Sequence, residues 1–138
     1  MKPVLLDTGV IVALLDRNER HHKSCVAAVQ GVAVPLVTCE AVIAESCYLL
    51  RSFHGAPEAI LENVVSGTFQ IPFQLSRSAS QIQRVFRKYK DREVDFADAC
   101  LIHLATEFQT GEILTLDHDF DVYQWGVNKP FRLLIPLT

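Results

Sequence analysis

The chain has 138 residues, 49% of them hydrophobic, and a formal net charge of −3, which fits one soluble domain. No apolar run approaches the ~20 residues that a membrane span requires, and the start of the chain lacks a secretory signal, so we expect a cytoplasmic protein. The mild acidity counts against a strongly basic nucleic-acid binder, although the carboxylates of a metal site would account for part of it.

Short apolar runs alternate with helical patterns along the chain. The expected strands are Val4–Leu6, Val32–Val37, Phe69–Phe73, Ile113–Leu116 and Arg132–Ile135. The expected helices are Val10–Leu15 after a Thr8-Gly9 turn, Ser24–Gln30, Cys39–Phe53 capped by Thr38, Pro57–Val65, one from Ser76 or Ser78 to Tyr89, and Asp95–Phe108. Pro35 should restrict pairing of the second strand to its end. This alternation predicts an α/β domain over residues 1–138, with a parallel sheet and helices on both faces.

The cysteines and histidines do not form a zinc motif. Cys25, Cys39, Cys47 and Cys100 include no CxxC pair, so buried, reduced thiols are expected. His21 and His22 are adjacent and would point to different faces of a helix, which makes them a poor metal clip.

Two aspartates follow expected strands. Asp7 comes after the first strand and Asp117 after the fourth, and ligands of open parallel sheets bind at the carboxyl ends of the strands. Either aspartate taken alone is equally well explained as a turn residue.

Two further acids lie in apolar helical segments. Glu45 is the only charged residue between Glu40 and Arg51, and the apolar residues around it predict a largely buried helix. A salt bridge or backbone donors would also satisfy a buried Glu45. Asp95 and Asp98 fit the N-cap and N3 positions of the next helix, which explains Asp95 better than Asp98, since Asp98 precedes an apolar run.

Together Asp7, Glu45, Asp98 and Asp117 have the character of a hard-cation site. Mg²⁺ and Mn²⁺ take oxygen ligands, often two carboxylates together with water and a substrate phosphate. We therefore expect these four carboxylates to line one acidic pocket at the carboxyl edge of the sheet.

At these residues the chain resembles the PIN-domain family, in particular the VapC-type toxins of bacterial toxin–antitoxin pairs. The matching segments are residues 5–15, Glu45, residues 96–99 and residues 114–120 (Leu-Thr-Leu-Asp-His-Asp-Phe). The resemblance implies a three-layer α/β/α fold with a five-stranded, mainly parallel sheet, and Mg²⁺- or Mn²⁺-dependent cleavage of single-stranded RNA. It also implies a homodimer and a small antitoxin that blocks the site.

The resemblance assigns roles residue by residue. Asp7, Glu45, Asp98 and Asp117 match the four acidic positions of the family, and Asp7, Asp98 and Asp117 are expected to hold the metal. The supporting residues are Thr8, beside the first acid, Asp95, where the family commonly has Ser or Thr, and Asp119, an often acidic position.

A basic stretch precedes the Asp95 helix. Its expected RNA contacts are Arg84, Arg87, Lys88, Lys90 and Arg92, since basic side chains position a phosphate backbone. A solvated helix face is the plainer explanation of the same pattern.

The expected mechanism is hydrolysis by water that the ion activates and that Glu45 or Asp7 orients, leaving a 5′-phosphate and a 3′-hydroxyl. His118 is the one candidate for the general base of a metal-free ribonuclease, and a surface position explains it better. Two other classes stay open. A phosphatase or receiver domain would use Asp7 as phosphate acceptor, but such phosphatases usually carry a second Asp where this chain has Gly9. A non-catalytic module with the same fold would be expected to lose some of the four acids, and all are present.

Overall fold

The computed structural model describes residues 2–136 and contains a five-stranded sheet. Its order is β3-β2-β1-β4-β7, and all four pairings are parallel. The strands are β1 (Val4–Leu6), β2 (Leu36–Val37), β3 (Phe69–Gln70), β4 (Glu112–Leu114) and β7 (Arg132–Leu133). The predicted α/β class with a parallel sheet is confirmed, and β2 pairs only beyond Pro35, as expected.

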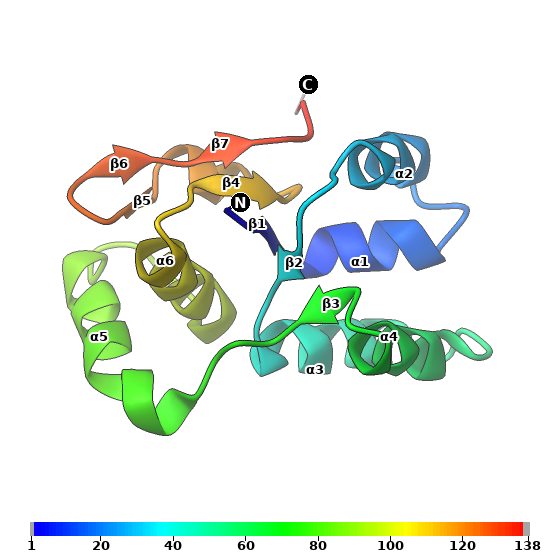
Figure 1. Ribbon diagram of the computed structural model, residues 1–138, viewed down its shortest axis with the longest axis horizontal. Coiled ribbons are helices and arrows are strands. Elements are labelled where there is room, and N and C mark those ends of the chain that lie inside the picture. The colour runs from blue at the N-terminus through cyan, green and yellow to red at the C-terminus, as the bar shows by residue number, and fades with distance from the viewer. Residues whose placement is uncertain (1, 137–138) are drawn as a thin grey trace.

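Helices cover both faces of this sheet. They are α1 (Thr8–Leu15), α2 (His22–Gln30), α3 (Glu40–Leu49), α4 (Ala56–Val65), α5 (Leu75–Lys88) and α6 (Phe96–Phe108). Figure 1 shows α5 and α6 on one side and α1 and α2 on the other, with α3 and α4 near the β3 end. The three-layer α/β/α arrangement is therefore confirmed.

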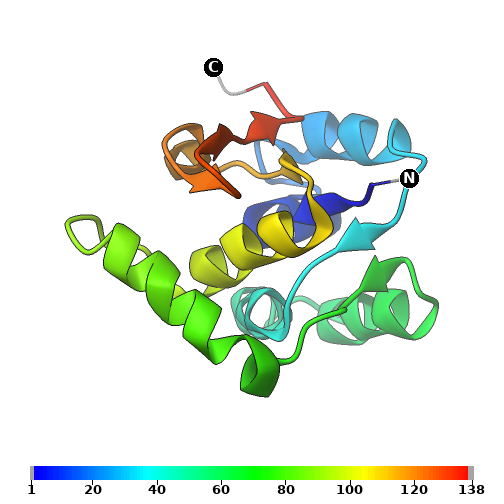
Figure 2. The same cartoon turned by 60° about the vertical axis from the view of Figure 1, so that its left-hand side comes forward.

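The core forms where the central strands meet α6. All three residues of β1 are buried, and so is every residue of α6 from Ala97 to Ala105. A helix that is apolar around its whole circumference needs neighbours on every side, and α5 supplies one of them. In α5 only Ser78 and Ile82 are buried, and this polar helix packs along α6 on the outside of the molecule (Figure 2).

Several expected helix boundaries are wrong. The segment Thr8-Gly9 is the first turn of α1, because Asp7 takes the N-cap position and accepts the Thr8 N–H. Thr38 does not cap α3. Its buried hydroxyl donates to the Leu6 carbonyl oxygen at 2.8 Å and so ties β1 to the chain after β2. α3 ends at Leu49 rather than Phe53, and α5 begins at Leu75 without a serine cap.

The segment after β4 carries structure that the sequence patterns do not predict. A short 3₁₀ helix, η1 (His118–Asp121), leads into an antiparallel hairpin of β5 (Gln124–Trp125) and β6 (Lys129–Pro130). Gly111 admits this hairpin, because a Cβ there would overlap the Trp125 indole nitrogen. The indole N–H donates to the Pro130 carbonyl oxygen at 3.0 Å. The hairpin thus packs next to Gly111, directly before the start of β4.

The four cysteines are free thiols, of which Cys25, Cys39 and Cys100 are buried and Cys47 is partly buried. Within residues 2–136, no helix combines the length and the apolar character needed to cross a bilayer.

Candidate active site

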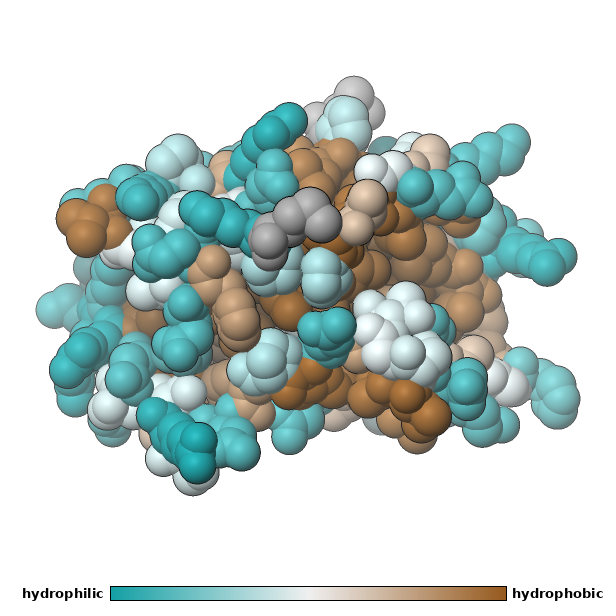
Figure 3. Space-filling view, in the orientation of Figure 1, coloured by the Kyte–Doolittle hydropathy of each residue, from teal (hydrophilic) through white to brown (hydrophobic). Residues whose placement is uncertain are grey.

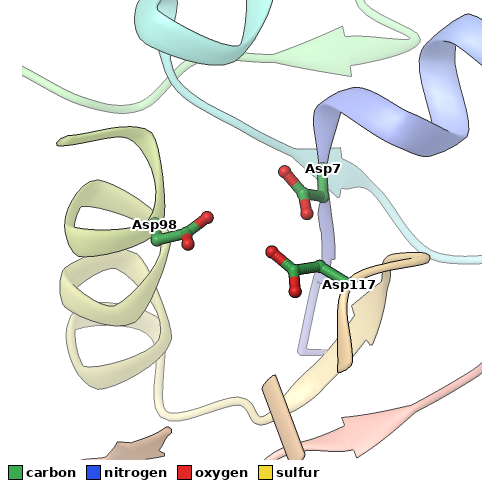
Figure 4. Close-up of side chains that lie close together, drawn as sticks. All are labelled: Asp7, Asp98 and Asp117. Carbon is green, nitrogen blue, oxygen red and sulfur yellow. The ribbon is translucent and has the colours of Figure 1, made fainter. Parts of the chain in front are cut away.

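Three aspartates meet at the carboxyl edge of the sheet. Asp7, Asp98 and Asp117 each offer one carboxylate oxygen, and these oxygens lie within 4.8 Å of one another. Figure 4 shows Asp7 at the junction of β1 and α1, Asp98 on the first turn of α6, and Asp117 on the segment after β4, with the side chains converging. Within the described chain this is the one group of three or more acidic, histidine or cysteine side chains close enough to share a metal ion.

Asp7 is held by two hydrogen-bond donors. Its Oδ1 accepts the Thr8 N–H at 2.8 Å, and its Oδ2 accepts the Thr115 hydroxyl at 2.7 Å. The side chain is almost fully buried. Both donors favour the ionised carboxylate, so the surrounding backbone and side chains are arranged to receive a negative charge.

Thr115 connects two of the three aspartates. While its hydroxyl donates to Asp7, its oxygen accepts the Asp117 backbone N–H at 3.0 Å. Asp117 is held further by η1, since its Oδ1 accepts the Asp119 N–H at 2.9 Å. Two residues separate Asp117 from the end of β4 at Leu114, so the expectation that it follows the strand directly is wrong. The side chain of Thr115 fixes its position instead.

Asp98 is placed by Asp95 and Tyr123. Asp95 is the N-cap of α6, as predicted, and its carboxylate accepts the Asp98 N–H at 2.8 Å. The Tyr123 hydroxyl donates to Asp98 Oδ2 at 3.3 Å. This arrangement orients the first turn of α6 so that Asp98 points into the cluster.

Burial and mutual repulsion raise the pKa values of two acids of the cluster, Asp7 and Asp98. Burial raises the pKa of Asp7 to about 6, even though its two hydrogen bonds lower it and the nearby Asp117 and Asp95 raise it further. Burial, followed by the charges of Asp95, Asp7 and Asp117, raises the pKa of Asp98 to about 8. Burial and the Asp98 carboxylate raise the pKa of Tyr123 above its usual value, so Tyr123 stays a donor. Near neutral pH Asp98 therefore retains its proton unless a cation replaces it.

A cavity of about 500 Å³ opens in front of these aspartates. Its walls carry five acidic side chains and one histidine, together with apolar and small residues: Asp7, Thr8, Gly9, Glu45, Leu49, Asp95, Ala97, Asp98, Leu116, Asp117 and His118. The Thr8 hydroxyl is buried in this wall and has no hydrogen-bond partner within residues 2–136. An unpaired buried hydroxyl is costly, so its position in the wall is suited to a polar ligand.

Glu45 lines the same cavity from α3, but its surroundings differ from the expectation. Its side chain is exposed, as are Tyr48 and Leu49 on the same helix. The predicted largely buried helix is thus wrong, because α3 buries one face only. Partial burial, and then the charge of Asp95, still raise the pKa of Glu45. Glu45 therefore needs no buried partner, and its carboxylate faces solvent within the cavity.

The other predicted site residues lie farther from the three aspartates. The Asp119 carboxylate forms an exposed ion pair with Arg92 at 3.6 Å and lines a neighbouring cavity with Arg92 and Tyr123. Arg84 and Lys88 line a groove beside the β5–β6 hairpin. All five basic residues predicted to contact RNA are exposed. His118 pairs with Asp121 at 3.5 Å and is largely exposed at the cavity rim.

The three clustered aspartates fit a hard divalent cation. Magnesium–oxygen distances of about 2.1 Å place two ligands of one ion roughly 3–4 Å apart. Oxygens within 4.8 Å reach that geometry by small side-chain rotations. The donor set is entirely oxygen, which suits Mg²⁺ or Mn²⁺ rather than a soft metal.

Two residues of the site do not emerge from the sequence patterns. Thr115 carried a signal, since it is the one polar residue of the apolar run Ile113–Leu116 and lies two positions before Asp117. Tyr123 carried none, because its contact with Asp98 joins residues 25 positions apart, and the 3₁₀ helix that precedes it was not predicted.

Comparison with known proteins points to one family. The family model for the PIN domain matches residues 4–126. Ribonuclease VapC26 of Mycobacterium tuberculosis is 30% identical over 116 residues, which cover 83% of this chain and 86% of that protein. The crystal structure of Mycobacterium tuberculosis VapC20, described as a sarcin–ricin loop cleaving toxin, superposes with a TM-score of 0.77. That match has 18% identity and covers 86% of this chain and 93% of the other.

The family match covers most of the chain, the fold is that of VapC20, and the acidic cluster lies at the carboxyl edge of the sheet. This chain belongs to the PIN domain family.

Proposed function

We propose that this chain is a Mg²⁺- or Mn²⁺-dependent endoribonuclease and the toxin of a toxin–antitoxin pair, with residues 1–138 forming one nuclease domain. The observation that carries the proposal is the trio of carboxylates within 4.8 Å at the edge of a PIN-domain sheet. The likeness to a protein named ribonuclease VapC26 supports RNA as the substrate.

The proposed catalytic residues are Asp7, Glu45, Asp98 and Asp117. Asp7, Asp98 and Asp117 would hold the ion, which supplies charge neutralisation at the phosphate and lowers the pKa of water. Glu45 faces the same cavity from α3 and would accept the proton of the attacking water. The water oxygen would form a bond to phosphorus as the bond to the ribose 3′-oxygen breaks, and the 3′-oxygen would take a proton from solvent. The products are a 5′-phosphate and a 3′-hydroxyl.

The supporting residues act through these four. The unpartnered Thr8 hydroxyl would donate to a phosphate oxygen or an ordered water in the cavity. Asp95 holds the first turn of α6 and adds negative charge beside Asp98. The backbone N–H of Asp119 orients Asp117. The Asp119 carboxylate pairs with Arg92 beside the neighbouring cavity that both residues line.

Two observations favour this function over the alternatives. A phosphatase with a phospho-accepting Asp7 usually carries a second aspartate two residues later, where this chain has Gly9. A non-catalytic module would have no use for carboxylates held this close together, because their mutual repulsion destabilises the fold.

Basic residues at the C-terminal end of α5 would guide the RNA strand. Arg92 is the basic residue with the most direct link to the aspartate cluster. It lines a cavity together with Tyr123, whose hydroxyl contacts Asp98. Arg84 and Lys88 continue the positive charge along the hairpin groove, and Arg87 and Lys90 are exposed near them. Phosphate contacts of this kind position a strand without reading its sequence.

Exposed apolar side chains on α3 and α4 support a homodimer. Tyr48 and Leu49 on α3 are 61% and 48% exposed, and Leu61 and Val65 on α4 are 52% and 80% exposed. Figure 3 shows apolar surface in the region of α4. Exposed apolar surface marks interaction sites where it gathers in patches, and α3 and α4 pack against each other. A small antitoxin protein is the proposed inhibitor, and the four free thiols suit the reducing cytoplasm.

The Asp7→Asn variant tests the function directly. We expect Mg²⁺ or Mn²⁺ to support cleavage of total RNA by the wild type, EDTA to abolish it, and Asp7→Asn to reduce it by about three orders of magnitude, because a ligand charge is lost. Asp16→Asn, at the opposite end of α1, is the matched control and should keep full activity. The products should carry 5′-phosphates. A 2′,3′-cyclic phosphate product, or cleavage in EDTA that depends on His118, would contradict the metal mechanism.

The raised pKa values predict the pH dependence of the metal-free protein. Asp7 and Asp98 hold protons in the folded state up to about pH 6 and 8, whereas the unfolded chain releases them near 3.8. The free energy of unfolding should therefore fall as pH rises from 4 to 8, by at least about 1.4 kcal/mol, the value of one pKa unit. Urea unfolding should show a smaller fall for Asp7→Asn/Asp98→Asn, and Mn²⁺ should restore wild-type stability at pH 8. Parallel curves for the two proteins would argue against the assignment.

Arg92→Ala tests the RNA path. We expect KM for RNA to rise several-fold with kcat unchanged, and the dependence of binding on log salt to lose a slope of about one. Stability should barely change, since the Arg92–Asp119 pair is exposed. Arg77→Ala, near the other end of α5, is the control. Equal effects of the two substitutions would indicate only a general effect of net charge.

Light scattering tests the assembly. The purified protein should be a dimer at micromolar concentration, and Leu61→Lys should make it monomeric by placing a charge in the apolar contact. Val127→Lys, at a position 86% exposed on the β5–β6 turn, should leave the dimer intact. A monomeric wild type would refute the dimer.

Addition of the small protein encoded beside this gene should suppress the cleavage of RNA.

A further inference from the structure

The Asp98 carboxylate depends on a single side chain for its orientation. Within the described residues, the Tyr123 hydroxyl is its one side-chain hydrogen-bond donor, at 3.3 Å from Oδ2. Asp7, by contrast, accepts from two donors, one on each oxygen. We propose that Tyr123 is a positioning residue, which holds Asp98 Oδ2 and leaves Oδ1 free to bind a divalent cation together with Asp7 and Asp117. This inference rests on the metal-dependent function proposed above.

The ring of Tyr123 is rigidly placed. Its side chain is 2% exposed, and it packs edge-to-face against Phe120 and Tyr89, with ring centroids 5.1 Å away in both pairs. Its backbone N–H donates to the Asp119 carbonyl oxygen at 3.0 Å. These contacts restrict the movement of the ring, so its hydroxyl is a fixed point against which Asp98 is aligned.

Asp98 needs such a fixed point because its neighbours repel it. The charges of Asp95, Asp7 and Asp117 all act on its carboxylate. In the absence of the hydroxyl, rotation about the terminal bond of the side chain would turn the oxygens away from Asp7 and Asp117. Groups that hydrogen-bond to metal ligands typically change metal affinity or activity about 10- to 100-fold when they are removed.

Tyr89 provides a matched control within the same aromatic cluster. It is also buried, and its hydroxyl accepts the Gln124 N–H at 2.8 Å rather than contacting an acid. Tyr89→Phe and Tyr123→Phe therefore remove the same atom from neighbouring rings. Only Tyr123→Phe removes a contact to a carboxylate of the cluster.

The test is Mn²⁺ binding to the purified protein, measured by calorimetry and by the electron paramagnetic resonance signal of free Mn²⁺. Tyr123→Phe should weaken binding about 10-fold or more, whereas Tyr89→Phe should stay within about twofold of wild type. The Mn²⁺ concentration that gives half-maximal cleavage should rise by the same factor, while the rate at saturating Mn²⁺ recovers to within a few-fold. Thermal unfolding of both variants checks that the fold is intact.

The outcomes separate the two proposals. If the wild type binds Mn²⁺ and Tyr123→Phe binds it equally well, the positioning role of Tyr123 is refuted and the metal-dependent function stands. Equal losses in both variants would also refute it, because they would reflect packing of the aromatic cluster. If the wild type binds neither Mn²⁺ nor Mg²⁺, the proposed function fails and this inference fails with it.

Discussion

Repulsion between carboxylates is the constraint on which the rest of the site depends. Two charges 4.8 Å apart repel by roughly 3 kcal/mol at an effective dielectric constant of about 20. One hydrogen bond to a charged group stabilises the folded protein by about 1.5–3 kcal/mol. The donors from Thr8, Thr115, Tyr123 and Asp119 therefore offset only part of the repulsion among three ionised aspartates and the cost of burying two of them. Protons or a cation must balance the remainder.

The same constraint explains where the rigidity of the fold is concentrated. Several sheet strands have only two residues, so the sheet alone is a weak frame. α6 compensates, because its continuous burial from Ala97 to Ala105 fixes it against its neighbours on all sides. Asp98 belongs to this buried segment, and Asp7 directly follows the fully buried β1. The repelling groups thus sit on the elements least able to move apart.

Sequence patterns predicted the parts of the structure that depend on local periodicity. The strands before Asp7 and Asp117, the cap at Asp95 and the order of strands and helices all follow from runs of a few residues. The surroundings of Glu45 did not, because Tyr48 and Leu49 are apolar yet exposed, and periodicity treats such residues as buried. The hydrogen bond from Tyr123 to Asp98 and the ion pair between Asp119 and Arg92 each join residues more than 20 positions apart. Such contacts are set by tertiary packing, and no local pattern encodes them.

The bridge made by Thr115 has a consequence for the protein during its own synthesis. Its hydroxyl reaches back 108 positions to Asp7, and its oxygen also accepts the backbone N–H of Asp117. In a nascent chain whose β4 has not yet paired with β1, Asp7 lacks the hydrogen bond from Thr115. Asp117 is then not held beside Asp7 either. The complete cluster therefore forms only after β4 has joined the sheet and Asp117 has taken its place beside Asp7.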